Sequence, residues 1–344
     1  MKQLLAFTPG VNHPSSRLRM AAYADHFLRR GWQLRMHHFD SGMGKALPRS
    51  GSWWKRAIRR LNRGGQTVRA AAALRKLHPD DPIVVSRELP VSRRPFLKAP
   101  NPMVLDVDDA LYLGPGRDRL LELCQHAQVV VCGNPTLAKE LSPFSRRCAV
   151  IPTVVDTDRY RVRTDYRLNG PLRAGWLGSS MSIEQTLLPW LDVLGEIRRQ
   201  VSFELVVISD EPPRFLQDIG WARFLQWSPA VETSIADHMD VGIMPLQDTP
   251  CQAAKCGAKL VQYLAAGLPV IASPVGVNRD IVVDGVTGYW AANPDEWRQA
   301  IHRLAEQETL RAAFGRAGRE QVVRNYSIAR WTGQWVDLLN GLGL

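Results

Sequence analysis

The sequence predicts an α/β protein made of two successive α/β halves. Short apolar runs, bounded by Pro, Gly or polar residues, alternate with segments of helical periodicity along most of the chain. Continuous apolar runs of this kind are typical of parallel strands that helices cover on both faces. The alternation starts again after residues 156–158, and 344 residues are enough for two domains.

The first half contains six predicted strands. They are the apolar runs at residues 3–7, 33–39, 82–86, 102–106, 128–132 and 149–152. Helical periodicity predicts helices over residues 16–30 and 135–141, and Gly31 ends the first of them.

The second half repeats this alternation. Its predicted strands are residues 173–178, 204–209, 241–245 and 269–272. Its predicted helices are residues 183–200, 258–266, 294–306, 308–324 and 328–339.

The composition is that of an ordinary globular protein. No apolar stretch approaches the about 20 residues of a membrane-spanning helix, and the N-terminal apolar run is too short for a signal peptide. The cysteines are odd in number and lack the paired spacings of metal ligands: Cys124, Cys132, Cys148, Cys251 and Cys256. We therefore expect reduced thiols, no metal site and a cytoplasmic protein.

The formal net charge of +11 is concentrated in one segment, because residues 41–79 contain many Lys and Arg but no Asp or Glu. In a helix, Trp54, Ile58 and Leu61 share one face. Such a helix suits an anionic membrane surface, with indoles at the interface and arginines on phosphates. The candidate membrane contacts are Trp53, Trp54, Arg56, Arg59, Arg60 and Arg63. The alternative is a helix packed on the sheet, with a solvated basic face.

Residues 240–280 predict a strand, a loop, a helix, a second strand and a glycine loop. Gly257 precedes the helix and can allow the backbone to approach a ligand, while the helix N-terminus offers free N–H groups. With Lys255 and Lys259 beside it, this N-terminus is a candidate pyrophosphate site. A turn with two surface lysines is the alternative interpretation.

Residues 260–272 (Leu-Val-Gln-Tyr-Leu-Ala-Ala-Gly-Leu-Pro-Val-Ile-Ala), Gly276 and residues 284–288 resemble the signature of the family 4 glycosyltransferases. In that family two glutamates eight residues apart flank the loop, one near the donor sugar and one near the ribose. This sequence has Ala254 and Gln262 at those positions. The pattern Lys-Cys-Gly-x-Lys…Gln-Tyr resembles a branch of the family in which Gln replaces Glu.

Ala254 and Gln262 both replace glutamates that lie near the donor in the family. A glutamine at position 262 can still hydrogen-bond a ribose hydroxyl. Lys255 or Asp248 is expected to take over part of the role of the missing first carboxylate. Residues 174–180 resemble the first strand and loop of the family's donor lobe, where the loop faces the phosphates. The candidate donor-binding residues are Gly178, Ser179, Ser180, Lys255, Gly257, Lys259, Gln262 and Gly276.

The resemblance implies a GT-B fold, in which two Rossmann-like α/β/α lobes face a central cleft. The acceptor lobe would span residues 1–165 and be joined by the last helix, residues 328–344, and the nucleotide-sugar lobe would span residues 170–325. The implied reaction is transfer of a sugar from a nucleotide-sugar donor to a glycan, lipid-linked or small-molecule acceptor. It would retain the anomeric configuration and need neither metal nor cofactor.

On the acceptor side, the resemblance includes three segments that reach the cleft. Arg17, Arg19 and Arg87 are the candidate acceptor-side residues. Asp108 and Asp109 are the candidates for the catalytic residues, although an Asp pair also occurs in helix caps and turns.

Three other functions fit part of the sequence. One is another GT-B chemistry, such as that of a nucleotide-sugar epimerase or a phosphorylase, although phosphorylases are usually much longer and carry a lysine-bound cofactor. The basic charge would suit a nucleic-acid-binding protein, but no nucleic-acid-binding module is recognisable, so we expect no nucleic-acid partner. Ala254 and Gln262 would suit a GT-B protein that binds nucleotide sugars without turning them over. We expect the protein in the cytoplasm, with peripheral attachment to the inner face of the membrane if the basic helix binds lipid.

Overall fold

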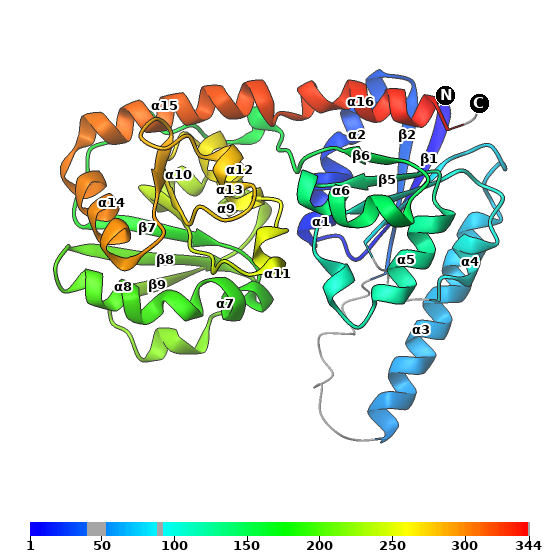
Figure 1. Ribbon diagram of the computed structural model, residues 1–344, viewed down its shortest axis with the longest axis horizontal. Coiled ribbons are helices and arrows are strands. Elements are labelled where there is room, and N and C mark those ends of the chain that lie inside the picture. Colours follow the sequence, from blue (N-terminus) through cyan, green and yellow to red (C-terminus); the bar gives the residue numbers. More distant parts are fainter. Residues whose placement is uncertain (40–52, 88–91, 343–344) are drawn as a thin grey trace. The chain divides into compact units, whose positions relative to one another are not determined.

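The computed structural model describes residues 1–39, 53–87 and 92–342, without the side chains of residues 53–60 and 62. The chain divides into two compact units (Figure 1). Unit 1 comprises Met1–Thr153, Ala254–Cys256 and Ile328–Leu344, and unit 2 comprises Val154–Ala253 and Gly257–Ser327. The described residues of each unit form one parallel six-stranded sheet with helices packed on it.

The sheet of unit 1 has the order β2-β1-β3-β4-β5-β6. Its strands are β1 (Lys2–Thr8), β2 (Trp32–His38), β3 (Ile83–Ser86), β4 (Met103–Val107), β5 (Val129–Cys132) and β6 (Cys148–Val150). The helices of this unit are α1 (Pro14–Arg19), α2 (Ala24–Arg29), α3 (Trp53–Leu74), α4 (Arg94–Leu97), α5 (Arg117–His126), α6 (Pro135–Leu141) and α16 (Ile328–Asn340).

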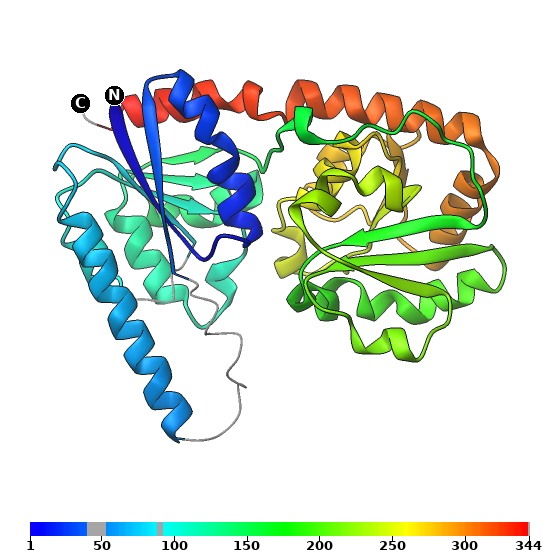
Figure 2. The ribbon, with the colours of Figure 1, turned by 180° about the vertical axis from the view of Figure 1, so that it is seen from behind.

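The central strands β3, β4 and β5 of the unit 1 sheet are buried along their whole length, which explains why they are short, mainly apolar runs. Successive side chains of a strand point to opposite faces. Leu5 and Phe7 of β1 therefore share one core with α3, α4, α5 and α6. Helices α1, α2 and α16 lie on the other side (Figure 2). There Tyr23 and Phe27 pack edge-to-face on Trp335 of α16.

The sheet of unit 2 has the order β12-β11-β10-β7-β8-β9. Its strands are β7 (Leu172–Leu177), β8 (Phe203–Ser209), β9 (Ala222–Gln226), β10 (Val241–Met244), β11 (Val270–Ala272) and β12 (Gly288–Trp290). The helices are α7 (Ser180–Thr186), α8 (Leu191–Arg198), α9 (Pro229–Thr233), α10 (Ile235–His238), α11 (Pro250–Ala253), α12 (Ala258–Ala265), α13 (Asn278–Ile281), α14 (Pro294–Glu306) and α15 (Glu308–Asn325).

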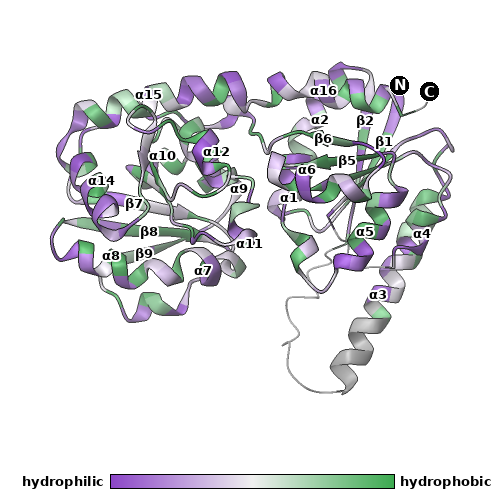
Figure 3. Cartoon of the chain, viewed as in Figure 1, coloured by the Kyte–Doolittle hydropathy of each residue, from purple (hydrophilic) through white to green (hydrophobic). Residues whose placement is uncertain are grey.

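A second core holds unit 2 together. Trp176 of β7 and Trp297 of α14 are both fully buried in it, and side chains of α7, α8 and α15 complete it. The helices alternate between hydrophilic and hydrophobic residues along their length, as expected for helices with one face on a core (Figure 3).

The predicted fold class is confirmed, and most predicted elements are present. Two helices that were predicted as continuous are each split in two. The helix over residues 16–30 is split, because α1 ends at Arg19 and a 3-10 turn at Ala21–Tyr23 precedes α2. The helix over residues 183–200 is split by a 3-10 turn at Leu188–Trp190, where Pro189 removes a backbone donor. Helix α5 and strands β9 and β12 were missed.

No helix in the described ranges is both long and apolar enough to cross a membrane. All five cysteines are free.

Candidate functional site

Most donor-side candidates follow the carboxyl ends of strands in the unit 2 sheet: Gly178, Ser179, Ser180, Gly257, Lys259 and Gly276. All strands of this sheet are parallel, so the loops after their carboxyl ends lie on the same edge. From β7 the chain adds β8 and β9 on one side of the sheet and then β10, β11 and β12 on the other side, so the strand order switches between β7 and β10. Ligands of α/β folds bind at such a switch point. Gly178 follows β7 directly, so it lies at this point.

Lys259 lies against the turn at Gly178. Its ammonium is 4.9 Å from the ring centroid of Trp176, which is a cation–π distance. A Cβ atom on Gly178 would lie 2.6 Å from the Trp176 ring and 2.8 Å from Cε of Lys259. Only glycine fits at position 178, because Lys259 and Trp176 occupy the space that a side chain would need.

The loop after Gly178 offers fewer free amides than the sequence suggested. The amide of Gly178 donates to the Ile208 carbonyl at 3.0 Å, and that of Ser180 donates to Oδ1 of Asp210 at 2.6 Å. These two N–H groups are already used within unit 2. Asp210, which sequence reasoning did not select, is therefore a structural partner of this loop.

The N-terminus of α12 is the candidate pyrophosphate site that the sequence predicted. Gly257 is its N-cap residue, with φ of 64°, and no side chain among the described residues caps the helix. The first N–H groups of a helix have no partner within that helix. A Cβ on Gly257 would lie 2.2 Å from Cδ1 of Ile281, so glycine is needed both for the left-handed backbone and for the packing.

The loop after β11 is fixed next to α11. Gly276 has φ of 53°, and a Cβ on it would lie 2.1 Å from the Ala253 carbonyl oxygen. The buried side chain of Asn278 donates to the Ser273 carbonyl at 2.9 Å and holds the same loop. Gly276 thus serves a close backbone approach, which the sequence alone could not distinguish from a ligand contact.

The two positions that depart from the family's glutamates are both buried. Gln262 is 4 % exposed, and its amide donates to the Tyr160 hydroxyl at 3.2 Å. Ala254 is fully buried in the core of unit 1, and its carbonyl accepts from Asn134 at 2.8 Å. The position of the first glutamate therefore holds a packed methyl group.

Lys255 and Cys256 belong to the short segment that is grouped with unit 1. The Lys255 carbonyl accepts from Nδ2 of Asn134 at 3.3 Å. The Cys256 thiol lies 3.2 Å from the Asp108 carbonyl, and a Cβ on Gly133 would lie 2.3 Å from its sulfur. Burial raises the pKa of Cys256 to about 12, so this thiol has a packing role.

The acceptor-side candidates form a polar cluster in unit 1. Arg87 reaches Asp108 at 3.4 Å and Asp109 at 3.2 Å, and its Nη1 donates to Oγ of Ser15 at 3.3 Å. Ser15 in turn donates to Oδ2 of Asp108. These residues follow β1, β3 and β4 at the carboxyl edge, and β1 and β3 are the switch-point strands of this sheet.

Arg87 holds a strained backbone at this cluster. Its φ of 64° is the only positive value for a non-glycine residue within the described ranges. Strain of this kind costs of order 1–3 kcal/mol and persists where surrounding contacts fix it. Here the amide of Arg87 donates to the Asp106 carbonyl at 2.7 Å, while its side chain is held by the two carboxylates.

Two pKa shifts describe the electrostatics of the cluster. Burial alone would raise the pKa of Asp108, but Arg87, Arg19 and the hydrogen bond from Ser15 hold it below its ordinary value. Burial lowers the pKa of His13, and the positive charge of Arg87 lowers it further. His13 accepts from the Ser15 amide through Nδ1, which places the neutral ring at the start of α1.

Arg19 was assigned to the acceptor side, but its side chain is buried. It forms a bidentate ion pair with Asp106, and Nη1 donates to the Ile151 carbonyl at 3.0 Å. The Arg19 side chain is 1 % exposed and that of Asp106 is 0 % exposed, so Arg19 cannot touch an acceptor. Arg17 lies nearer the surface and donates to the Asn12 carbonyl.

The basic segment is confirmed as a helix, since α3 begins at Trp53. The side chains of five predicted membrane contacts lie outside the described residues: Trp53, Trp54, Arg56, Arg59 and Arg60. Arg63 is exposed. In the described part of the chain, no cluster of His, Cys, Asp and Glu has the arrangement of a metal site.

Residues 174–307 match the family Glycosyl transferases group 1. This segment runs from β7 to the end of α14 and includes all of the unit 2 candidates. Together with the two parallel α/β units, the match supports a glycosyltransferase with the GT-B fold.

The matched relatives agree with this class. Trehalose synthase from Pyrococcus horikoshii is 28 % identical over 87 residues, which are 25 % of this chain and only 21 % of that protein. Sucrose-phosphate synthase from Thermosynechococcus elongatus has a TM-score of 0.74 at 15 % identity, over 99 % of both chains. Anabaena HepE, solved with UDP and glucose, has a TM-score of 0.69 at 13 % identity over 99 % of this chain and 100 % of that one.

Proposed function

We propose that the protein transfers a sugar from a nucleotide-sugar donor to a hydroxyl group of an acceptor. The observation that carries this proposal is the N-terminus of α12, uncapped by any described side chain, with Lys259 in its first turn and the whole arrangement inside the segment matched to the glycosyltransferase family. Unit 2 takes the donor in this proposal, and unit 1 takes the acceptor.

The chemistry follows from the charges of the reaction. When the bond between the sugar and the diphosphate breaks, negative charge grows on the leaving phosphate. The free N–H groups at the start of α12 and the Lys259 ammonium stabilise this charge without a metal ion. In this proposal Lys255, which shortly precedes α12 in sequence, supplies a second positive charge for the leaving phosphate. Retention of the anomeric configuration is part of it by resemblance to family 4.

The donor of first choice is a uridine diphosphate sugar. Anabaena HepE has been solved with UDP-glucose, and the pneumococcal O-GlcNAc transferase GtfA with UDP and GlcNAc. Both proteins share the fold at 13 % identity, so they suggest which nucleotides to test first. In this proposal Gln262 is a ribose contact only if its bond to Tyr160 opens.

On the acceptor side, Asp109 is the better candidate for the group that receives the acceptor proton. Its side chain is 33 % exposed, whereas that of Asp108 is 12 % exposed and holds Ser15 and Arg87. We assign Asp108 to positioning Arg87. The acceptor is a polyol, such as a glycan or the sugar of a lipid-linked intermediate.

Peripheral attachment to an anionic membrane belongs to the same proposal. Ala70 and Leu74 of α3 are buried, but Leu61 and Val68 are 75 % and 68 % exposed. At seven residues apart these two share one face of the helix, opposite to Ala70. The exposed apolar face suits a bilayer interface better than it suits packing on the sheet.

A second candidate is a protein that binds nucleotide sugars without turnover. The observation that favours it is the buried methyl group of Ala254 where the family has a glutamate near the donor sugar. Binding would then survive while transfer fails.

The experiment is a thermal-shift and calorimetric screen against UDP, GDP, ADP and their sugar conjugates, without added metal. A true donor raises the melting temperature with concentration, because it binds the native state only. Product analysis with the selected donor then separates transfer from mere binding. If no nucleotide stabilises the protein, both candidate functions, transfer and binding without turnover, are wrong.

A further inference from the structure

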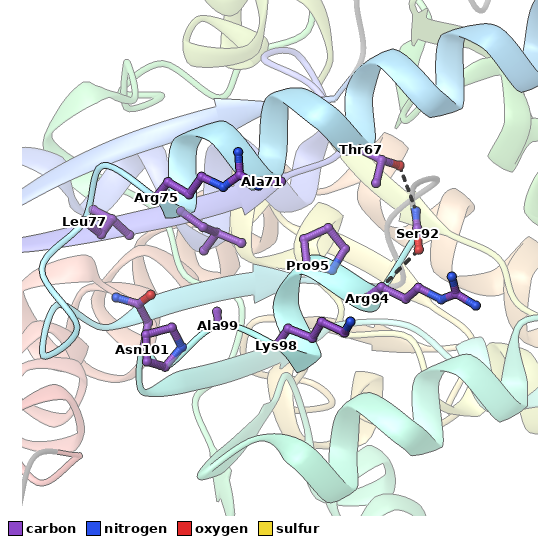
Figure 4. A pocket seen from close by; sticks show the side chains of 12 residues that line it. Thr67, Ala71, Arg75, Leu77, Ser92, Arg94, Pro95, Lys98, Ala99 and Asn101 are labelled. Carbon is purple, nitrogen blue, oxygen red and sulfur yellow. Dashed lines mark hydrogen bonds between the residues drawn. The ribbon is translucent and has the colours of Figure 1, made fainter.

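A groove of about 690 Å³ lies in unit 1 between the C-terminal half of α3 and the segment that contains α4 (Figure 4). Its floor is apolar and includes Leu74, Leu77 and Ala99. Two hydrogen bonds close one end, from the Ser92 amide to Thr67 and from the Arg94 amide to Ser92. The groove is therefore a built part of the fold.

Among the described residues, three basic side chains and no carboxylate line the groove: Arg75, Arg94 and Lys98. All three basic residues are exposed. Arginine and lysine side chains next to an apolar floor match an amphiphile with an anionic phosphate headgroup.

The groove adjoins the exposed apolar face of α3. That face contains Leu61, Val68 and Ala72, which follow one another at spacings of seven and four. Arg75, at seven residues from Val68, borders this face and also lines the groove. A bilayer that meets the apolar face would therefore bring its headgroups to the opening of the groove.

We infer that this groove binds the phosphate headgroup of an anionic phospholipid when α3 lies on a bilayer. The inference rests on the proposed membrane attachment and adds a specific headgroup site to it. Arg75, Arg94 and Lys98 contact the phosphate, and the apolar floor takes the glycerol and the first methylene groups of the lipid.

The test compares two variants with equal charge change by vesicle sedimentation. The groove variant carries Arg75→Gln, Arg94→Gln and Lys98→Gln. The control variant carries Lys139→Gln, Arg146→Gln and Arg147→Gln, which replace exposed cations elsewhere in unit 1. Both are expected to keep the wild-type melting temperature, because the six side chains are exposed.

The vesicles contain either phosphatidylcholine alone or phosphatidylcholine with phosphatidylglycerol. A basic residue near an anionic surface contributes about 1 kcal/mol, so losing three contacts weakens partitioning to anionic vesicles about 100-fold. The control variant is expected to lose much less, since its cations do not line the groove. Binding to neutral vesicles should be equal for both variants.

The outcomes separate the site from membrane attachment in general. If wild type binds anionic vesicles and both triple variants bind equally well or equally poorly, attachment exists but the headgroup site is wrong. If wild type binds neither type of vesicle, the membrane attachment itself fails. Binding of inorganic phosphate or glycerol phosphate in the absence of vesicles, lost in the groove variant only, would replace the lipid by a free phosphate ligand and overturn the inference.

Discussion

The ammonium group of Lys259 lies 4.9 Å from the ring centroid of Trp176. The contact joins the first turn of α12 to the end of β7, at the switch point of the unit 2 sheet. Because the Trp176 ring is fully buried, it fixes the lysine stem while the charge stays at the turn of Gly178. A lysine held in this way is already positioned for an anionic ligand, which lowers the entropy cost of binding.

Replacing Lys259 by Ala should weaken nucleotide binding more than it weakens the fold. A charged hydrogen bond to phosphate contributes about 1.5–3 kcal/mol, so Kd should rise roughly 10- to 100-fold. Titration calorimetry with the nucleotide selected by the thermal screen measures it. Lys139→Ala, at an exposed position of unit 1, is the matched control and should bind normally. Equal Kd values for wild type and Lys259→Ala would remove Lys259 from the donor site.

Arg19→Met should destabilise unit 1 strongly. The substitution keeps an apolar stem of similar length but leaves Asp106 buried without its partner. Breaking one side of a buried ion pair costs about 3–5 kcal/mol. Urea unfolding measures the loss, and Arg29→Met on the exposed surface of α2 should stay near wild type. A small loss for Arg19→Met would mean that the pair is not essential to the fold.

Much of the fold could be predicted because both sheets are parallel and buried. Strands such as β4 and β8 are apolar at nearly every position, so they stand out from the helices between them. Strand β9 did not stand out, because this edge strand is only half-buried and contains Arg223 and Gln226. The splits of two predicted helices depend on local backbone geometry that helical periodicity does not reveal.

The site was less predictable than the fold. The sequence predicted Gly257 and Lys259 as donor-side residues from their place at the start of an apolar helix, and this stays a prediction. It could not tell that Arg19 points into the core, because that depends on Asp106, which is 87 residues away in sequence. For the same reason, the hydrogen bond from Ser180 to Asp210 could not be predicted, because it depends on the pairing of β7 with β8.

The two aspartates should separate into a catalytic and a positioning role. Asp109→Asn is expected to lower kcat by 10²- to 10⁴-fold, the usual contribution of a general base, with little change in KM and a modest loss of stability from its contact to Arg87. Asp108→Asn is expected to lower stability as well, because it weakens the contacts to Arg87 and Ser15. Steady-state kinetics and urea unfolding of both variants give the comparison. Full activity of Asp109→Asn would exclude it as the base.

Stability should fall as the pH drops below about 6.5, in a way that depends on His13. Burial and Arg87 lower the pKa of His13, so the unfolded chain takes up this proton at a higher pH than the folded protein does. The stabilisation is therefore complete above the ordinary pKa of about 6.5 and decreases as the pH falls below it.

The check on His13 is the free energy of unfolding at several pH values. His13→Asn keeps an acceptor for the Ser15 amide but cannot titrate, so its stability should decline less steeply than that of wild type. Part of the decline should remain, because burial also lowers the pKa of His37 and His238. His78→Asn, where the side chain is 70 % exposed, should keep the wild-type decline. Parallel curves for wild type and His13→Asn would contradict the assignment.

Gly257→Ala should affect both the fold and the start of α12, and Gly285→Ala is its matched control. Both glycines have a left-handed backbone, with φ of 64° and 71°, so each alanine pays a strain of about 1 kcal/mol. Only Gly257 also meets a neighbour, since a Cβ would lie 2.2 Å from Cδ1 of Ile281, whereas no described atom lies within 4 Å of a Cβ on Gly285.

Gly257→Ala should therefore unfold more easily than Gly285→Ala and bind nucleotide more weakly, because relief of the clash moves the free N–H groups of α12. Adding Ile281→Ala to Gly257→Ala should restore nucleotide binding but leave the backbone strain. Equal nucleotide affinity in Gly257→Ala and Gly285→Ala would show that the start of α12 does not hold the donor.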